Sequence, residues 1–324
     1  MIAARPIIAG AWVLSVMLSA GAVTAAADPH FARPVTELEP ELESQPLQIA
    51  SATQSRPMAR GDVALKAEVS FGGAAPYRVK LRKAEPGADA FNNQPRYDLA
   101  AYELQKLFLD PADYVVPPTA LRMIPLADLQ PHAPAARPTF PGSDDVLAVV
   151  QYWLQDVTLA EDAYDATRFE TDQAYARRIG QLNVFTYLVR HGDSNLGNFL
   201  VSRSQDEFRV FSVDNNVAFG SDESDRGLLW RNLRVTRLPA DAIERLRRID
   251  DAQLRSRLAV LAQWELRDGH YQPVSPGGNL AAARGVRVGD GVVQMGLTSV
   301  EIRRVGSRLK HLLKEVDRGE IDTF

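Results

Sequence analysis

The chain has 324 residues, a length that allows about two domains of roughly 150 residues each. Hydrophobic residues make up 45% of the chain and charged residues 24%, which supports a large core and excludes a wholly disordered chain or a protein with many membrane spans. The 37 Lys and Arg residues nearly balance the 41 Asp and Glu residues, so the net charge of −4 gives no reason to expect a nucleic-acid partner. The chain contains no cysteine, which excludes disulfides, thiolate zinc sites, cysteine nucleophiles and a lipoprotein anchor.

The first 27 residues have the composition of a signal peptide. Arg5 precedes an apolar run over residues 7–23, and three alanines at 25–27 offer a cleavage site before Asp28. Cleavage there predicts a periplasmic or secreted protein without an integral membrane span, and the alternative is an anchor formed by an uncleaved N-terminal helix. Residues 28–58 are rich in Pro, Glu, Ser and Gln, which predicts a disordered leader or linker.

The remaining sequence predicts a small β-rich region followed by a larger helical one. The first region, residues 59–140, contains strands predicted over 63–69, 77–82 and 120–124 and a helix over 97–109. The proline-rich stretch 131–142 is the predicted boundary. The second region, residues 141–324, contains helices predicted over 145–157, 172–190, 240–266 and 298–316, and Thr298 with Glu301 forms a capping-box pattern at the start of the last helix.

One polar segment indicates a chemical function. Asp193 follows the helix predicted over 172–190, Asn198 stands five positions later, and a hairpin predicted over 199–213 leads to Asp214. The D-x-x-x-x-N spacing matches the kinase catalytic loop. Phosphoryl transfer needs a carboxylate near the attacking hydroxyl and hard oxygen ligands for a divalent ion on ATP. Asp193 is therefore the predicted catalytic residue, and Asn198 and Asp214 are the predicted ligands for Mg²⁺ or Mn²⁺. The structural alternative is that these residues cap turns and end an edge strand.

A kinase also needs a lysine for the ATP phosphates and an acid that fixes this lysine. Lys80 lies on a predicted strand and shares one face with Arg78 and Arg82, while Lys83 is a second candidate. The following helix offers Asp98 and Glu103 as the acid. An ordinary explanation for Asp98 is that acids in the first helical turn favour the helix dipole.

Several segments resemble the secretory-pathway kinases of the four-jointed and Golgi casein kinase family, an atypical kinase fold related to phosphatidylinositol kinases. The similarity is carried by 97–104 with the Val-Pro-Pro segment at 115–119, by 212–215 with 218–220, and by 229–248. It implies an α+β, two-lobed protein-kinase-like fold with a small β-rich N-lobe and a larger helical C-lobe. It also implies that Lys66 and Lys80 bind the nucleotide, and that Asp98, or else Glu103, stands in the place of the family's helix glutamate.

The segment around Asp193 departs from this family. The family's catalytic segment has the pattern D-R-H-x-x-x, whereas His191-Gly192-Asp193 with Gly197-Asn198 is closer to antibiotic phosphotransferases and ordinary kinases. The predicted function is an exported kinase that uses ATP with Mg²⁺ or Mn²⁺ and phosphorylates a hydroxyl of a protein, glycan or lipid. Two alternatives stay open: a pseudokinase that binds and scaffolds without turnover, since a bacterial periplasm contains little ATP, and a small-molecule phosphotransferase.

Overall fold

The computed structural model describes residues 28–55, 64–90, 93–160, 162–194, 197–204, 207–220 and 228–324. The predicted signal peptide lies outside these residues. Among the helices that are described, none has both the length and the apolar composition required to cross a bilayer. The chain mixes helices with largely antiparallel sheets, which confirms the predicted α+β class.

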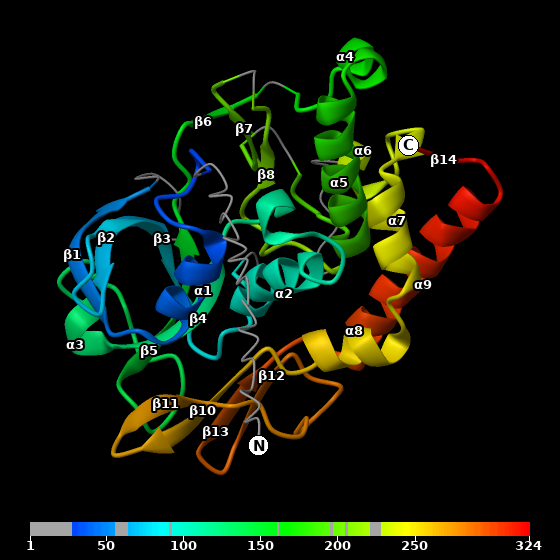
Figure 1. Ribbon diagram of the computed structural model, residues 1–324. Helices are drawn as coiled ribbons and strands as arrows, with labels where there is room; N and C mark the ends of the chain where they lie inside the picture. Colours follow the sequence, from blue (N-terminus) through cyan, green and yellow to red (C-terminus); the bar gives the residue numbers. More distant parts are fainter. Residues whose placement is uncertain are drawn as a thin grey trace, which may run out of the picture.

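The largest sheet has the strand order β1-β2-β3-β5-β4, and all its neighbouring strands are antiparallel (Figure 1). Side chains alternate along β3, so that Tyr77, Val79 and Leu81 enter the core while Lys80 stays half-buried on the other face. The strands predicted over 63–69, 77–82 and 120–124 are confirmed. The five strands are β1 (Leu47–Gln54), β2 (Ala64–Phe71), β3 (Tyr77–Lys83), β4 (Thr119–Pro125) and β5 (Asp145–Tyr152).

Strand β5 corrects two predictions. The helix predicted over 145–157 is wrong, because Asp145–Tyr152 form a strand whose residues are all buried. A strand buried on both faces shows no period-two alternation, so its apolar run cannot be told from a buried helix by sequence pattern. Because β5 pairs with β3 and β4, the predicted boundary at residue 140 cuts through this sheet.

The predicted disordered leader is also wrong for its described part, residues 28–55. These residues form α1 (Val35–Ser44) and β1, and α1 lies against β4. Leu38 and Leu42 of α1 are fully buried in the main core. Polar residues dominate the composition here, but the few apolar ones recur at helical spacing and need the sheet as a partner. Residues 56–58 of the predicted leader lie outside the described residues.

The residues just before α1 also pack against the core. The side chain of His30 is buried, with Nδ1 2.9 Å from the carbonyl oxygen of Gln155 and Nε2 3.0 Å from the hydroxyl of Ser202. Phe31 packs against the rings of Tyr152 and Phe211. This segment therefore joins the chain that leaves β5 to the hairpin that precedes Asp214.

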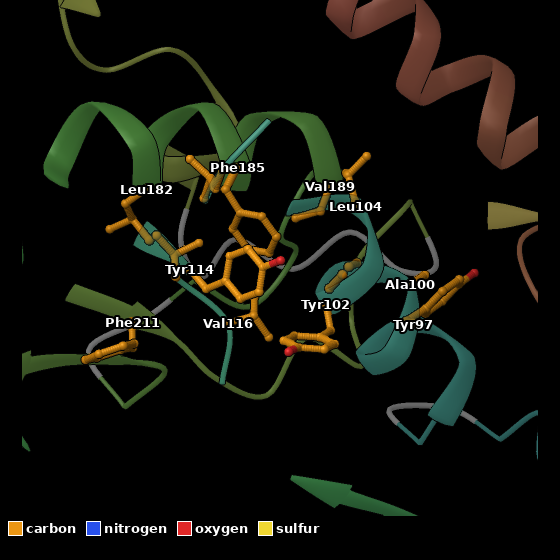
Figure 2. Close-up of a cluster of buried hydrophobic side chains, with 14 of the residues drawn as sticks. Tyr97, Ala100, Tyr102, Leu104, Tyr114, Val116, Leu182, Phe185, Val189 and Phe211 are labelled. Carbon is orange, nitrogen blue, oxygen red and sulfur yellow. The ribbon is translucent and has the colours of Figure 1, made fainter. Parts of the chain in front are cut away.

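Helices α2 (Pro95–Gln105) and α5 (Gln173–Val189) share the main core (Figure 2). Figure 2 shows Tyr114 and Val116, which precede β4, between Leu182 and Phe185 of α5 and the buried residues of α2. The helix predicted over 172–190 is confirmed in α5, and α2 covers most of the one predicted over 97–109. The strand β6 (Val157–Leu159), which precedes α5, joins β7 (Phe199–Ser202) and β8 (Val210–Ser212), which follow it, in a small antiparallel sheet.

The helix predicted over 240–266 is divided into three elements, which are α7 (Ala240–Arg247), α8 (Asp251–Leu258) and β10 (Ala262–Arg267). Asp250 interrupts it, because its carboxylate accepts a hydrogen bond from the Gln253 amide and forms a capping box that starts α8. The last predicted helix is confirmed as α9 (Ser299–Asp317), with the predicted capping box at Thr298.

A second sheet, in the order β11-β10-β13-β12, lies beside the first (Figure 1). Trp264 and Val293 of this sheet share a smaller core with Leu147 and Val149 of β5. Its further strands are β11 (His270–Val274), β12 (Val286–Gly289) and β13 (Val292–Met295). The remaining short elements are η1 (Pro111–Asp113), α3 (Leu126–Leu129), α4 (Ala166–Thr171), α6 (Leu228–Arg231), β9 (Arg237–Leu238) and β14 (Asp322–Thr323).

We predict that Leu38→Ala destabilises the protein by about 2–5 kcal/mol, because it removes a fully buried side chain and leaves a cavity between α1 and the sheet. Urea unfolding followed by circular dichroism measures the loss. Thr36→Ala, at an exposed position of the same helix, is the control and should stay within about 0.5 kcal/mol of the parent. Equal effects of the two substitutions would show that α1 is not part of the core.

The contact between the two sheets should depend on pH through His270. Its Nδ1 lies 2.8 Å from Oδ1 of buried Asp145, and the hydrogen bond and charge of Asp145 raise the pKa of His270 above its ordinary value of 6.5. The pair therefore stabilises the folded protein below about pH 6.5, and this contribution is lost as pH rises through the raised pKa. The difference in unfolding midpoint between the parent and His270→Gln should shrink over that range, whereas Gln272→Ala, at an exposed position of the same strand, should show no such trend. A difference that is constant with pH would contradict the prediction.

Candidate active site

A cleft of about 1080 Å³ opens between the five-stranded sheet and the small sheet β6-β7-β8. The sheet contributes Lys80, and the segment after β5 contributes Trp153. The opposite wall contains Asn198, which precedes β7, and Asp214, which follows β8. Three of the predicted site residues, far apart in the sequence, therefore line one cavity.

Asp214 is held in place by three donors that all reach its Oδ1. Lys80 Nζ and Arg82 Nη1 each lie 3.0 Å away, and Asn216 Nδ2 lies 2.8 Å away. The backbone of Asp214 has φ of 60°, in the left-handed region that few non-glycine residues adopt. Such a conformation costs free energy and is found where the surroundings fix a functional side chain.

The charge state of Asp214 follows from its neighbours. Burial alone would raise the pKa of this carboxyl group, but the charges of Lys80 and Arg82 outweigh burial and hold the pKa well below its ordinary value. The side chain remains 32% exposed toward the cleft. Asp214 is therefore a permanently ionised carboxylate at physiological pH, accessible to a cation.

Asn198 connects Asp193 to the strand hairpin. Its Nδ2 donates to the main-chain oxygen of Asp193 at 2.7 Å and to Oδ2 of Asp193 at 3.2 Å. Its own carbonyl oxygen accepts from the Val213 amide at 2.9 Å, directly before Asp214. The predicted catalytic carboxylate and the two predicted metal ligands are thus linked by a short chain of hydrogen bonds.

His191 lies behind this group and is fully buried. Its Nδ1 accepts a hydrogen bond from the Asp193 amide at 3.3 Å. Burial lowers the pKa of His191 to about 4, although the nearby carboxylates of Asp193 and Asp214 oppose the shift. His191 is therefore uncharged at neutral pH and supports the Asp193 turn as a neutral side chain.

Asp98, the acid expected to pair with Lys80, has a different partner in the structure. Asp98 is buried and pairs with Arg82, two residues beyond Lys80 on the same face of β3. The fallback residue Glu103 is corrected as well, because it pairs with Lys106 and with Arg257 of α8. The partner that the structure gives Lys80 is Asp214 itself.

The other predicted nucleotide lysine, Lys66, faces Lys80 across the β2–β3 ladder. Its Nζ lies 5.0 Å from the centre of the Trp153 ring, a cation–π contact at the rim of the cleft. Lys66, Arg78, Lys80 and Arg82 share one face of the sheet with the acid Glu68, and of these residues Arg78, Lys80 and Glu68 line the cleft. Lys83, the second candidate for the phosphate lysine, instead pairs with Glu85.

The donor set for a cation consists of oxygen atoms. Within the described part of the chain, no group of three or more His, Asp or Glu could hold a metal ion by itself. The side-chain hydrogen bonds of Asn198 use Nδ2, and those of Asp214 use Oδ1. Among the described residues, Asn198 Oδ1 and Asp214 Oδ2 therefore receive no donor. Two hard oxygen atoms suit Mg²⁺ or Mn²⁺ when phosphate oxygens complete the coordination.

Comparison with known proteins adds no relative: no family model matches the chain, and no curated protein sequence matches it. The resemblance to secretory-pathway kinases therefore stays a prediction from sequence motifs. Sequence pattern indicates no function for three residues of the site, namely Arg82, His191 and Asn216. Strand alternation places Arg82 on the Lys80 face, but its burial and its pairing with Asp98 and Asp214 depend on tertiary contacts.

Proposed function

We propose that this protein is a kinase-type phosphotransferase that uses ATP with Mg²⁺ or Mn²⁺ and phosphorylates a hydroxyl group. The observation that carries the proposal is the contact between Lys80 and Asp214 in one cleft with Asn198, beside Asp193. The order of the elements along the chain supports it. Helix α2 follows β3 and precedes β4 of the large sheet, and the β7–β8 hairpin separates Asn198 from Asp214. Sheet, helix and hairpin follow one another in the order that a two-lobed kinase fold requires.

The residues would divide the chemistry as follows. Asp214 and Asn198 would hold the divalent ion through their oxygen atoms, and the bound ion with its nucleotide would supply the phosphoryl group and neutralise its charge. Lys80 would turn from Asp214 toward the phosphates. Asp193 would accept the proton of the acceptor hydroxyl as that oxygen bonds to the γ-phosphorus and the bond to the bridging oxygen breaks. The acceptor is a protein, glycan or lipid, met in the periplasm or outside the cell if the N-terminal segment directs export.

We predict different losses at the two aspartates. Asp214→Asn should abolish metal-dependent nucleotide binding, because the amide keeps the hydrogen bonds at Oδ1 but loses the charge that a cation requires. Asp193→Ala should leave nucleotide binding intact and slow transfer from labelled ATP by about 10²-fold or more. The control is Glu244→Ala on the exposed face of α7, which should behave like the parent. Full activity in both aspartate variants would refute the proposal.

A protein that binds nucleotide without turnover is the second candidate. It is favoured by the three donors already bound to Asp214 Oδ1, two of them cationic, which weaken the attraction of this carboxylate for a metal. The same contacts imply that a metal ion enters with the nucleotide phosphates rather than alone.

We therefore predict that Mn²⁺ alone hardly changes the unfolding temperature, whereas Mn²⁺ with a non-hydrolysable ATP analogue raises it. Ligand at about 100 times its Kd would add about 2.7 kcal/mol to the free energy of unfolding. Thermal-shift titrations of the parent and of Asp214→Asn make the comparison. Stabilisation without phosphate transfer would favour the second candidate, and no response to metal and nucleotide together would contradict both.

A further inference from the structure

One buried arginine joins a carboxylate that lines the cleft, Asp214, to a buried carboxylate, Asp98. The Arg82 side chain is 1% exposed, and its Nη1 donates to Asp214 Oδ1 at 3.0 Å while its Nη2 pairs with Asp98 Oδ2. A guanidinium is planar and carries its donors in a fixed fork, so one arginine can hold two carboxylates in a set geometry. A lysine ammonium is a point charge on a flexible chain and does not fix the angle between two carboxylates in this way.

Lys80 reaches the same oxygen of Asp214 from a different environment. Its side chain is 20% exposed and lines the cleft, and it binds Asp214 Oδ1 with a single ammonium at 3.0 Å. If Lys80 turns toward a phosphate, Asp214 still receives hydrogen bonds from Arg82 and Asn216. Lys80 and Arg82 therefore have different roles: Lys80 can move within the cleft, whereas Arg82 is buried and held between two carboxylates.

Asp98, the second partner of Arg82, lies in the first turn of a helix that is itself anchored. Next to it, Arg96 binds both carboxylate oxygens of Glu301 at 2.7 and 3.0 Å, and the Tyr97 hydroxyl donates to the same group. Glu301 also caps α9 by accepting from the Thr298 amide. The contacts with α9 thereby fix the position of Asp98. Because Arg82 pairs with both Asp98 and Asp214, the position of Asp98 helps to set that of Asp214.

We propose that Arg82 is a positioning residue for Asp214, and that the acid of α2 acts on the site through Arg82 rather than through Lys80. The inference rests on the proposed function in so far as it concerns catalysis. It assigns Asp98 to the support of the metal-binding carboxylate and leaves Lys80 for the phosphates.

The test compares Arg82→Lys with Arg287→Lys in the full mature chain. Both arginines are buried, but Arg287 donates to the main-chain oxygens of Ala259 and Leu297 and contacts neither Asp98 nor Asp214. Arg82→Lys should lower kcat by roughly 10- to 100-fold, the cost of displacing a catalytic group by about 1 Å, and should raise the Mn²⁺ concentration needed for half-maximal rate. Both variants should lower the unfolding temperature, but Arg287→Lys should leave kcat and the Mn²⁺ requirement within about twofold of the parent. Similar kinetic losses in both variants, or none in Arg82→Lys, would overturn the inference.

Asp98→Asn and hydrogen exchange provide two further tests of the role of Arg82. Should Arg82→Lys not fold, Asp98→Asn retains the arginine, weakens its anchor and should show the same split between kcat and stability. Should the parent transfer no phosphate and bind no nucleotide, the proposed function fails, and hydrogen exchange of the free protein then decides the inference. In that case Arg82→Lys, and not Arg287→Lys, should speed amide exchange over residues 213–217, and equal exchange in the two variants would refute it.

Discussion

The structure depends on one constraint, which is the buried positive charge of Arg82. A guanidinium does not lose its proton in a protein, so an arginine that is almost wholly removed from water must be paired. Its partners come from two elements that are remote in sequence, Asp98 at the start of α2 and Asp214 after β8. Burying this one side chain therefore obliges the large sheet, the helix and the hairpin to meet at one point.

That meeting point is supported from behind by the second sheet and by α9. The smaller core joins β4 and β5 to β10–β13, and the pairing of Arg96 and Tyr97 with Glu301 fixes the start of α2. The segment before α1 adds a tie on the other side, where His30 bridges the chain after β5 and the end of β7. The cleft is thus bounded by elements that are each held at more than one place, which suits a site that must keep its charges at fixed distances.

The different partners of Asp98 and Glu103 are an example of a feature that tertiary contacts determine and a sequence pattern does not. The two acids are five positions apart, and therefore about 140° apart around a helix with 3.6 residues per turn. This spacing implies that only one of the two acids can face the sheet, but it does not indicate which of them does. The packing of α2 on α8 decides it, because Glu103 meets Arg257 on one side while Asp98 meets Arg82 on the other.

Local patterns by themselves determined the α+β class, the alternation of β2 and β3, the helix α5, the capping box of α9 and the polar hairpin that ends in Asp214, because each depends on neighbours within a few residues. Tertiary structure decided β5, whose two buried faces erase its periodicity, and α1, whose few apolar residues form a helix only against the sheet. It also decided the partners of Asp98 and Lys80. Pairing of buried charges is a property of three-dimensional packing, and strand alternation specifies only the face from which each charge points.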